Sequence, residues 1–122
     1  MLVKDDMVTE KILKCAVKVS RTLGVGFLEK VYENALVIEL SRSGMCVSQQ
    51  ESMRVEYCGE SVGVYIADIV VNDEVIVELK SCREIERIHQ AQLLNYLKAT
   101  SLRRGLILNF GTSRLGIKRM VL

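Results

Sequence analysis

The chain has 122 residues, of which 49% are apolar and 26% charged, a balance that excludes a disordered segment and predicts one globular domain over residues 1–122. The net charge of +2 is too small to indicate a nucleic-acid-binding protein by itself. No apolar run approaches the ~20 residues of a membrane span, and acidic residues follow the N-terminus where a signal peptide is cationic. We therefore expect a cytoplasmic protein with no membrane partner.

Two helices are predicted in the first third of the chain. Asp5 or Asp6 can cap the first helix. Its apolar stripe has helical spacing and consists of Val8, Ile12, Cys15, Ala16, Val19 and Leu23. The second helix is predicted over residues 28–43, with Gly44 as its C-terminal stop. Its expected inward residues are Val31, Ala35, Leu36 and Leu40. Glu29 lies in its first turn, where an acid complements the helix dipole.

Three antiparallel strands are predicted next. The pattern is typical of a strand from Cys46 to Cys58, and Gly59-Glu60 indicates a turn into the following strand. The stretch from Tyr65 to Lys80 predicts a β-hairpin, because two β-branched apolar runs flank the polar Asn72-Asp73-Glu74.

Three charged residues lie inside this hairpin, namely Asp68, Glu78 and Lys80. Burying an unpaired ionised group costs roughly several kcal/mol, so each charge needs a partner. One alternative is a salt bridge of Lys80 with either acid. The other is a divalent metal between Asp68 and Glu78. The metal alternative requires a three-residue loop or a bulge, because a two-residue loop would place Asp68 and Glu78 on opposite faces.

A third helix is predicted from about Glu84 to Thr100. Four apolar positions suit its buried side: Ile88, Ala91, Leu94 and Leu97. A second face is polar but uncharged, which a solvated surface would also explain, and it consists of His89, Gln92 and Tyr96. The apolar run over residues 106–111 predicts a strand buried on both faces, parallel to its neighbour because a helical crossover reaches it. A closing strand over residues 115–121 completes the order ααβββαββ, with Lys118 and Arg119 exposed at the sheet edge.

This order, with Asp68 on one strand and Glu78-Leu79-Lys80 on the next, resembles the PD-(D/E)XK nuclease superfamily. The resemblance implies an α/β (α+β) fold, a restriction-endonuclease-like mixed central sheet flanked by helices. Residues 26–32, Gly-Phe-Leu-Glu-Lys-Val-Tyr, resemble the G-x-x-E-x-x-Y signature of the GxxExxY proteins, a prokaryotic family placed in that superfamily. Three further segments resemble that family in the same order, at residues 77–80, 91–97 and 108–111.

The resemblance implies metal-dependent hydrolysis of phosphodiester bonds. Asp68 and Glu78 would bind the metal with help from the Leu79 carbonyl, and Glu29 looks like the helix-borne acid that completes metal binding in related nucleases. Hard oxygen ligands select Mg²⁺ or Mn²⁺ over zinc. The implied partner is nucleic acid, with DNA favoured over RNA.

The remaining residues carried over by the resemblance surround the metal site. Lys80 would orient or activate the attacking water and offset charge on the phosphate. Gln92 and Tyr96 match a Q-x-x-x-Y motif that borders the site in a helicase-linked and phage exonuclease branch. One departure is Ala67, which stands where the superfamily name has Pro, a position that shapes backbone rather than chemistry.

Two other classes of function stay open at this point. The first is a non-catalytic nucleic-acid or protein-binding module that keeps the nuclease fold. The intact set of Asp68, Glu78 and Lys80 argues against it, because a site freed from catalysis has no reason to keep charges in strands. The second is a structural subunit that forms a homo-oligomer by pairing the edge strand Leu115–Val121 with another chain.

Overall fold

The computed structural model describes the backbone of residues 4–122 and the side chains of residues 7–122. The elements confirm the predicted order and run α1 (Lys4–Leu23), α2 (Glu29–Arg42), β1 (Val47–Tyr57), β2 (Glu60–Val71), β3 (Val75–Lys80), α3 (Arg87–Thr100), β4 (Arg104–Asn109) and β5 (Gly116–Val121). The side chains of Asp5 and Asp6, the predicted caps of α1, lie outside the described residues. No helix in the described part of the chain is long and apolar enough to cross a membrane.

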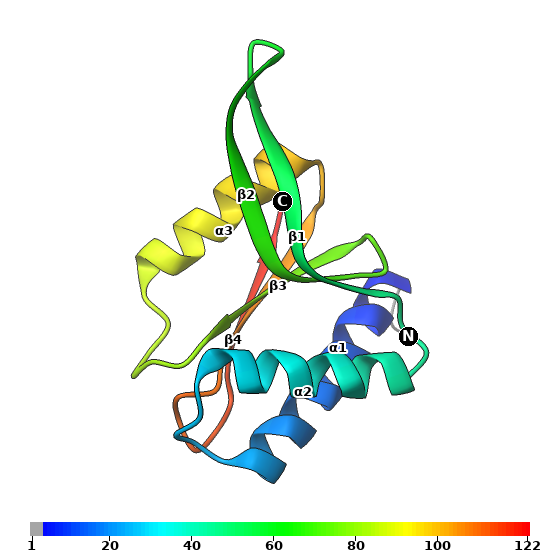
Figure 1. The fold of residues 1–122 in the computed structure, drawn as a ribbon, viewed down its shortest axis with the longest axis vertical. Helices are drawn as coiled ribbons and strands as arrows, with labels where there is room; N and C mark the ends of the chain where they lie inside the picture. The colour runs from blue at the N-terminus through cyan, green and yellow to red at the C-terminus, as the bar shows by residue number, and fades with distance from the viewer. Residues whose placement is uncertain (1–3) are drawn as a thin grey trace.

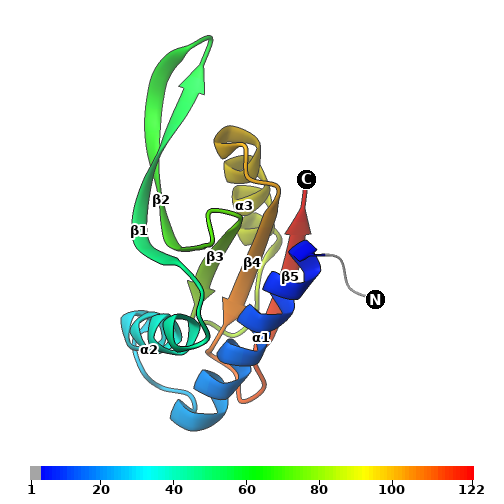
Figure 2. The ribbon, with the colours of Figure 1, turned by 90° about the vertical axis from the view of Figure 1, so that its right-hand side faces the viewer.

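The five strands form one mixed sheet in the spatial order β1-β2-β3-β4-β5. Only β3 and β4 are parallel, as the helical crossover predicts, and the other neighbours are antiparallel. Helices α1 and α2 lie on one side of the sheet and α3 lies on the other (Figures 1 and 2). This three-layer arrangement confirms the expected α+β class with a central sheet flanked by helices.

Each side of the sheet buries its own apolar cluster. The predicted stripe of α1 is confirmed and packs with Leu36 and Leu40 of α2 against the sheet. In α2 the prediction for Val31 is wrong, since that side chain is 39% exposed and the neighbouring Tyr32 is buried in its place. An aromatic ring with a hydroxyl on its tip can fill the core and still reach polar partners at the rim, which the shorter Val31 cannot do.

The buried face of α3 differs from the predicted one. Ile88 is 56% exposed and Ala91 is exposed, whereas Leu93 and Leu97 are almost fully buried. The helix also begins at Arg87 rather than Glu84, because the His89 ring accepts a hydrogen bond from the backbone N–H of Glu86 (Nδ1–N 3.1 Å) and caps the first turn. Because Leu93 and Leu97 form the buried side of the helix, the polar face that contains Tyr96 turns toward the sheet.

The β2–β3 hairpin has the three-residue loop that the metal alternative requires. Val71 pairs with Val75, and Asn72 and Asp73 adopt left-handed backbone conformations with φ of 54° and 53°. Asn and Asp tolerate this region better than other non-glycine residues, so the loop sequence suits the turn. The pairing continues to Ile69 and Val77, and one further step in this register places Asp68 opposite Glu78.

The β1–β2 ribbon bends where β2 leaves β3 and extends well beyond the rest of the sheet (Figure 1). Ala67 and Ile69 are two residues apart and would share a face in a flat strand. Ile69 nevertheless joins the cluster under α1 and α2, whereas Ala67 joins the cluster under α3. The change of face occurs at Asp68 and at Gln50, which lies opposite it in β1 and has φ of 50°.

Candidate functional site

Asp68 lies at the point where strands β2 and β3 separate. The last ladder pair is Ile69 with Val77, so the β3 backbone beyond it has lost its β2 partner. The Leu79 N–H donates instead to Asp68 Oδ2 at 2.9 Å. A carboxylate thus replaces the missing strand partner, because a backbone N–H left unpaired at this depth would cost free energy. The bend in β2 therefore places the Asp68 carboxylate at the end of β3.

Glu78 shares this end of β3, where burial disfavours its charged form. Burial raises the pKa of its carboxyl to about 8, and the negative charge of nearby Asp68 adds to the increase. The Tyr65 hydroxyl donates a hydrogen bond to Glu78 Oε1, which opposes the increase only in part. Burial and the Glu78 charge in turn raise the pKa of Tyr65, so the proton of this bond stays on the phenol. Tyr65 was not among the residues predicted for the site.

Lys80, Gln92 and Tyr96 line one small cavity with Glu78. The cavity measures about 30 Å³ and lies between β3, β4 and α3, and His89, Leu93 and Ile107 complete its wall. The ring of Tyr96 stacks on that of Tyr65, with centroids 3.6 Å apart, so α3 reaches Glu78 through two aromatic rings. Within the described residues, Lys80 forms no ion pair with Asp68 or Glu78.

The helix-borne acid that connects to Asp68 is Glu33 rather than Glu29. Glu29 is exposed in the first turn of α2, whereas Glu33, one turn later, is only 4% exposed. The amide of Gln50 donates to Glu33 Oε1 at 2.9 Å and to Asp68 Oδ1 at 3.3 Å. The structure thus joins Asp68 to Glu33, and it places Glu29 outside this network.

The acids Glu29 and Glu33 of α2 could not be distinguished by spacing. Residues four apart lie on the same side of a helix, so Glu29 and Glu33 point in similar directions. Only the docking of α2 against β1 decides which acid is buried, and Glu33 also accepts hydrogen bonds from Lys30 and Gln49. The signal available in the sequence was the acid at i+4 from Glu29 on an otherwise apolar side.

Comparison with known proteins identifies the family. A family model described as the PD-(D/E)XK nuclease superfamily matches residues 6–120, nearly the whole chain. The chain belongs to the PD-(D/E)XK nuclease superfamily. Neither the curated proteins nor the solved structures gave a match.

Within this PD-(D/E)XK chain, the segment after β4 holds the end of β3 in place. Asn109 is almost fully buried; its Oδ1 accepts from the N–H groups of Cys82 and Gly111, and its Nδ2 donates to the Cys82 carbonyl, each at 3.0 Å. The Phe110 N–H donates to the Lys80 carbonyl at 2.8 Å. These bonds fix the backbone at Lys80 and just after it, and so the origin of its side chain.

The tyrosine of the G-x-x-E-x-x-Y signature anchors the loop before α2. The Tyr32 hydroxyl donates to the Gly24 carbonyl at 2.6 Å and accepts from the Phe27 N–H at 3.2 Å. Its ring stacks on Phe110 with centroids 4.8 Å apart. Tyr32 therefore ties the start of α2 to the strand that supports Lys80, which is a structural role within the nuclease fold.

The acids of the PD-(D/E)XK site suit a hard divalent cation by their chemistry. Asp68, Glu78 and Glu33 offer carboxylate oxygens, the ligand type that Mg²⁺ and Mn²⁺ prefer. Burial and then the nearby Asp68 charge raise the pKa of Glu78, and a bound cation would favour its ionised form. Among the described residues, however, no group of three or more His, Cys, Asp or Glu side chains is close enough together to hold a metal. The fit to a metal thus rests on Asp68 and Glu78, and Glu33 is joined to Asp68 through Gln50.

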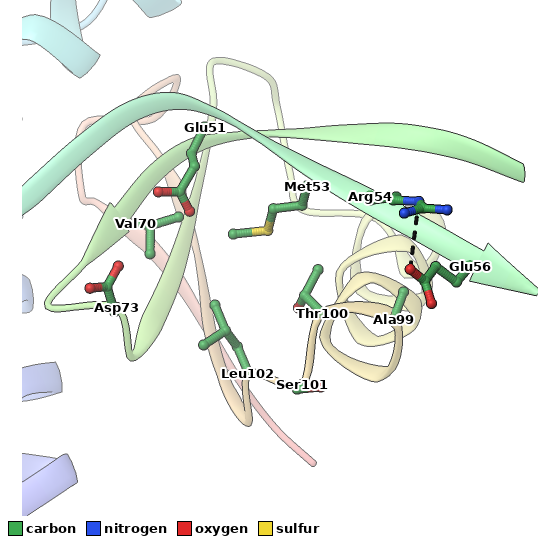
Figure 3. Close-up of a pocket in the computed structure, with 10 residues that line it drawn as sticks. All are labelled: Glu51, Met53, Arg54, Glu56, Val70, Asp73, Ala99, Thr100, Ser101 and Leu102. Carbon is green, nitrogen blue, oxygen red and sulfur yellow. Dashed lines mark ion pairs between the residues drawn. The ribbon is translucent and has the colours of Figure 1, made fainter. Parts of the chain in front are cut away.

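A larger cleft of about 460 Å³ lies between the β1–β2 hairpin and the C-terminal end of α3 (Figure 3). Glu51, Arg54 and Glu56 of β1 form one wall, where Arg54 and Glu56 are paired at 3.5 Å. None of the predicted site residues lines this cleft. Its size therefore does not make it the candidate site, which is identified by the acids at the β2–β3 separation.

Proposed function

We propose that this protein is a Mg²⁺-dependent nuclease that hydrolyses phosphodiester bonds, with DNA as the favoured substrate and Mn²⁺ as an alternative ion. Membership of the superfamily supports nuclease-like function. The observation that carries the proposal further is the pair of Asp68 and Glu78 at the end of β3, with the pKa of Glu78 raised and no ion pair from Lys80 within the described residues. A purely structural pair of partly buried acids would be expected to recruit that lysine.

In this proposal the metal ligands are Asp68, Glu78 and the Leu79 carbonyl. A bound divalent cation would polarise the phosphoryl oxygen and lower the pKa of water. We propose Glu33 as the third acid, on the strength of its link to Asp68 through Gln50. The role predicted for Glu29 stays a prediction, and matched variants of the two acids, described in the Discussion, discriminate between them.

The other residues of the cavity would act on water and phosphate. Lys80 would orient the attacking water and stabilise the negative charge that develops on the phosphate, since it forms no ion pair among the described residues. Gln92 and Tyr96 border the cavity and would position the substrate backbone. Tyr65 would keep Glu78 oriented through the hydroxyl that donates to Oε1.

The test is a cleavage assay on plasmid, linear duplex and single-stranded DNA and on RNA, with MgCl₂, MnCl₂ or EDTA. We expect cleavage with either metal and none in EDTA. Asp68→Asn and Lys80→Met should each reduce the rate by about a hundredfold or more. The exposed residues Asp73 and Lys98 supply matched controls, Asp73→Asn and Lys98→Met, which should cleave at the wild-type rate. Equal rates for Asp68→Asn and wild type would reject the proposal.

The alternative of a non-catalytic binding module has one observation in its favour. The described residues contain no ready-made cluster of three or more metal-ligating side chains. Such a module would bind nucleic acid equally well in EDTA and in MgCl₂ and would release no product. Gel-shift measurements in both buffers, alongside the cleavage assay, separate it from the nuclease.

Self-association through the last strand is also a proposal. Strand β5 pairs only with β4 and forms one edge of the sheet, where Val121 is exposed. Lys118 and Arg119 on the same strand oppose pairing with an identical copy, since like charges would approach each other. Size-exclusion chromatography at two concentrations decides whether the protein self-associates.

A cytoplasmic location is likewise still a prediction.

A further inference from the structure

Gln50 occupies an unusual place in strand β1. Its neighbours Gln49 and Glu51 pair with Ile69 and Ala67 of β2, so Gln50 lies opposite Asp68. Its backbone is left-handed, with φ of 50°. This conformation costs a β-carbon-bearing residue roughly 1 kcal/mol or more, so contacts around it must hold it in place.

The side-chain amide of Gln50 joins two acids from different elements. The same nitrogen, Nε2, donates to Glu33 Oε1 on α2 and to Asp68 Oδ1 on β2. One neutral donor group therefore satisfies two carboxylates that would otherwise repel each other. A divalent cation shared by these acids would compete with Gln50 for the same two oxygens.

The network is built so that Gln50 can leave at small cost. Without Gln50, Glu33 keeps its bonds from Lys30 and Gln49, at 3.0 and 2.7 Å. Asp68 keeps the N–H of Leu79 at 2.9 Å. Gln50 is exposed, so water can solvate its amide once it has turned away. Among the described donors to Asp68 or Glu33, Gln50 is the one that donates to both, so its departure frees an oxygen of each acid.

We propose that Gln50 is a metal-responsive positioning residue, which holds Asp68 and Glu33 together in the metal-free protein and yields both acids when a divalent cation binds. This inference rests on the proposed function, because it assumes that these acids take up a metal. Gln50 prepares the site by bridging Asp68 and Glu33 before the metal binds. It touches no reacting atom.

The test compares melting temperatures of wild type, Gln50→Leu and Gln49→Leu in EDTA and in saturating MgCl₂. Gln50→Leu should melt about 3–6 °C lower than wild type in EDTA, because Asp68 and Glu33 lose their shared donor. In MgCl₂ this deficit should shrink by half or more, because the ion takes over the holding of both acids.

Gln49→Leu is the matched control. Its amide donates to Glu33 and Asn34 but not to Asp68, so it does not bridge the two acids. Its deficit should be the same in both buffers. An independent readout is the ¹⁵N–¹H signal pair of the Gln50 side-chain amide, which should shift during a MgCl₂ titration while the Gln49 pair shifts less.

The outcomes separate this inference from the function on which it rests. A wild type with no magnesium response, by melting and by calorimetry, overturns both. A wild type that responds, with an equal Gln50→Leu deficit in the two buffers and a static Gln50 amide signal, overturns the inference alone and leaves the metal site standing. A deficit that shrinks in MgCl₂ only for Gln50→Leu supports both.

Discussion

Glu78 and Asp68 bring two carboxyl groups to the end of β3, and their environments differ. Asp68 accepts two hydrogen bonds, from the Leu79 N–H and the Gln50 amide. Glu78 accepts a hydrogen bond from the Tyr65 hydroxyl, and its pKa is raised to about 8 by burial and then by the Asp68 charge. Two neighbouring acids with such different surroundings are a frequent feature of catalytic and metal sites.

Removing the Asp68 charge should lower the pKa of Glu78. In Asp68→Asn we expect this pKa to fall below 8 yet stay above its ordinary value of 4.5, because burial is the larger cause and persists. Carboxyl ¹³C chemical shifts followed against pH, in EDTA, measure the change. Asp73→Asn, in the exposed loop of the same hairpin, is the control and should leave the Glu78 titration where it is.

Glu29 and Glu33 of α2 should respond differently to the loss of charge. Glu33→Gln should cost about 1–3 kcal/mol of unfolding free energy, because its new amide nitrogen must face donors that now contact a carboxylate. Glu29→Gln, at an exposed position, should stay within about 0.5 kcal/mol of wild type. Urea unfolding measures both. If Glu29→Gln loses magnesium binding and Glu33→Gln keeps it, the original prediction for Glu29 holds and our assignment of Glu33 is wrong.

At the scale of elements, the site depends on how the ends of β3 and β4 are held together. The loop after β3 and the residues after β4 approach so closely that a side chain on Gly111 would overlap the backbone of Cys82. Asn109 completes the connection with hydrogen bonds to both residues. The segment Asn109-Phe110-Gly111, at the end of β4, thus holds the backbone at the end of β3, where Lys80 lies.

Gly111→Ala should therefore disturb the site as well as the fold. The added methyl group must push the Cys82 backbone away, and we expect a loss of about 2–4 kcal/mol in unfolding free energy together with weaker cleavage. Gly63→Ala is the matched control, because a Cβ at Gly63 in the hairpin meets no atom within 4 Å. Urea unfolding and the cleavage assay compare the two. Similar stabilities would show that the loop after β3 can move freely.

Across the whole molecule, the sheet has two parts with different surroundings. Strands β3, β4 and β5 are covered by helices, whereas the β1–β2 ribbon bends away from them and extends beyond the helices (Figure 2). The bend at Asp68 and Gln50 opens the β2–β3 ladder beside Glu78, and Gln50 there links Asp68 to Glu33 of α2. A straight β2 would have closed the site with backbone hydrogen bonds.

Global stability without metal should fall as the pH rises. Glu78 has a folded pKa of about 8 against an ordinary value of 4.5, so folding takes up a proton between these values. Its stabilising contribution is full below about pH 4.5 and is lost as the pH rises through about 8, with a slope approaching 1.4 kcal/mol per pH unit in between.

The difference in unfolding free energy between wild type and Glu78→Gln isolates this effect in EDTA. We expect the difference to change steadily between pH 5 and 8 and to level off above that. Saturating MgCl₂ should reduce the loss of wild-type stability at high pH, because the ionised carboxyl binds the cation. A pH-independent difference in EDTA would contradict the raised pKa of Glu78.

Much of this arrangement was determined by the sequence. The order of elements follows from local periodicity and turn residues, and the polar Asn72-Asp73-Glu74 segment indicates the hairpin, although the sequence left its loop length open and the structure decided for three residues. The charged residues stood out because strands rarely hold them without a partner. Short-range patterns are enough for such features, since the residues involved are neighbours in the chain or in one hairpin.

Tertiary structure alone decided which side chains complete the site. Glu29 and Glu33 share one side of α2, and only the packing of that helix against β1 buries Glu33 beside Gln50. Tyr65 reaches Glu78 because the ribbon bends and α3 stacks Tyr96 on its ring. Helical and strand periodicity specify the direction of a side chain but not the rotation of one element against another. That rotation is set by packing between segments distant in sequence, and it selects the residues that meet at the end of β3.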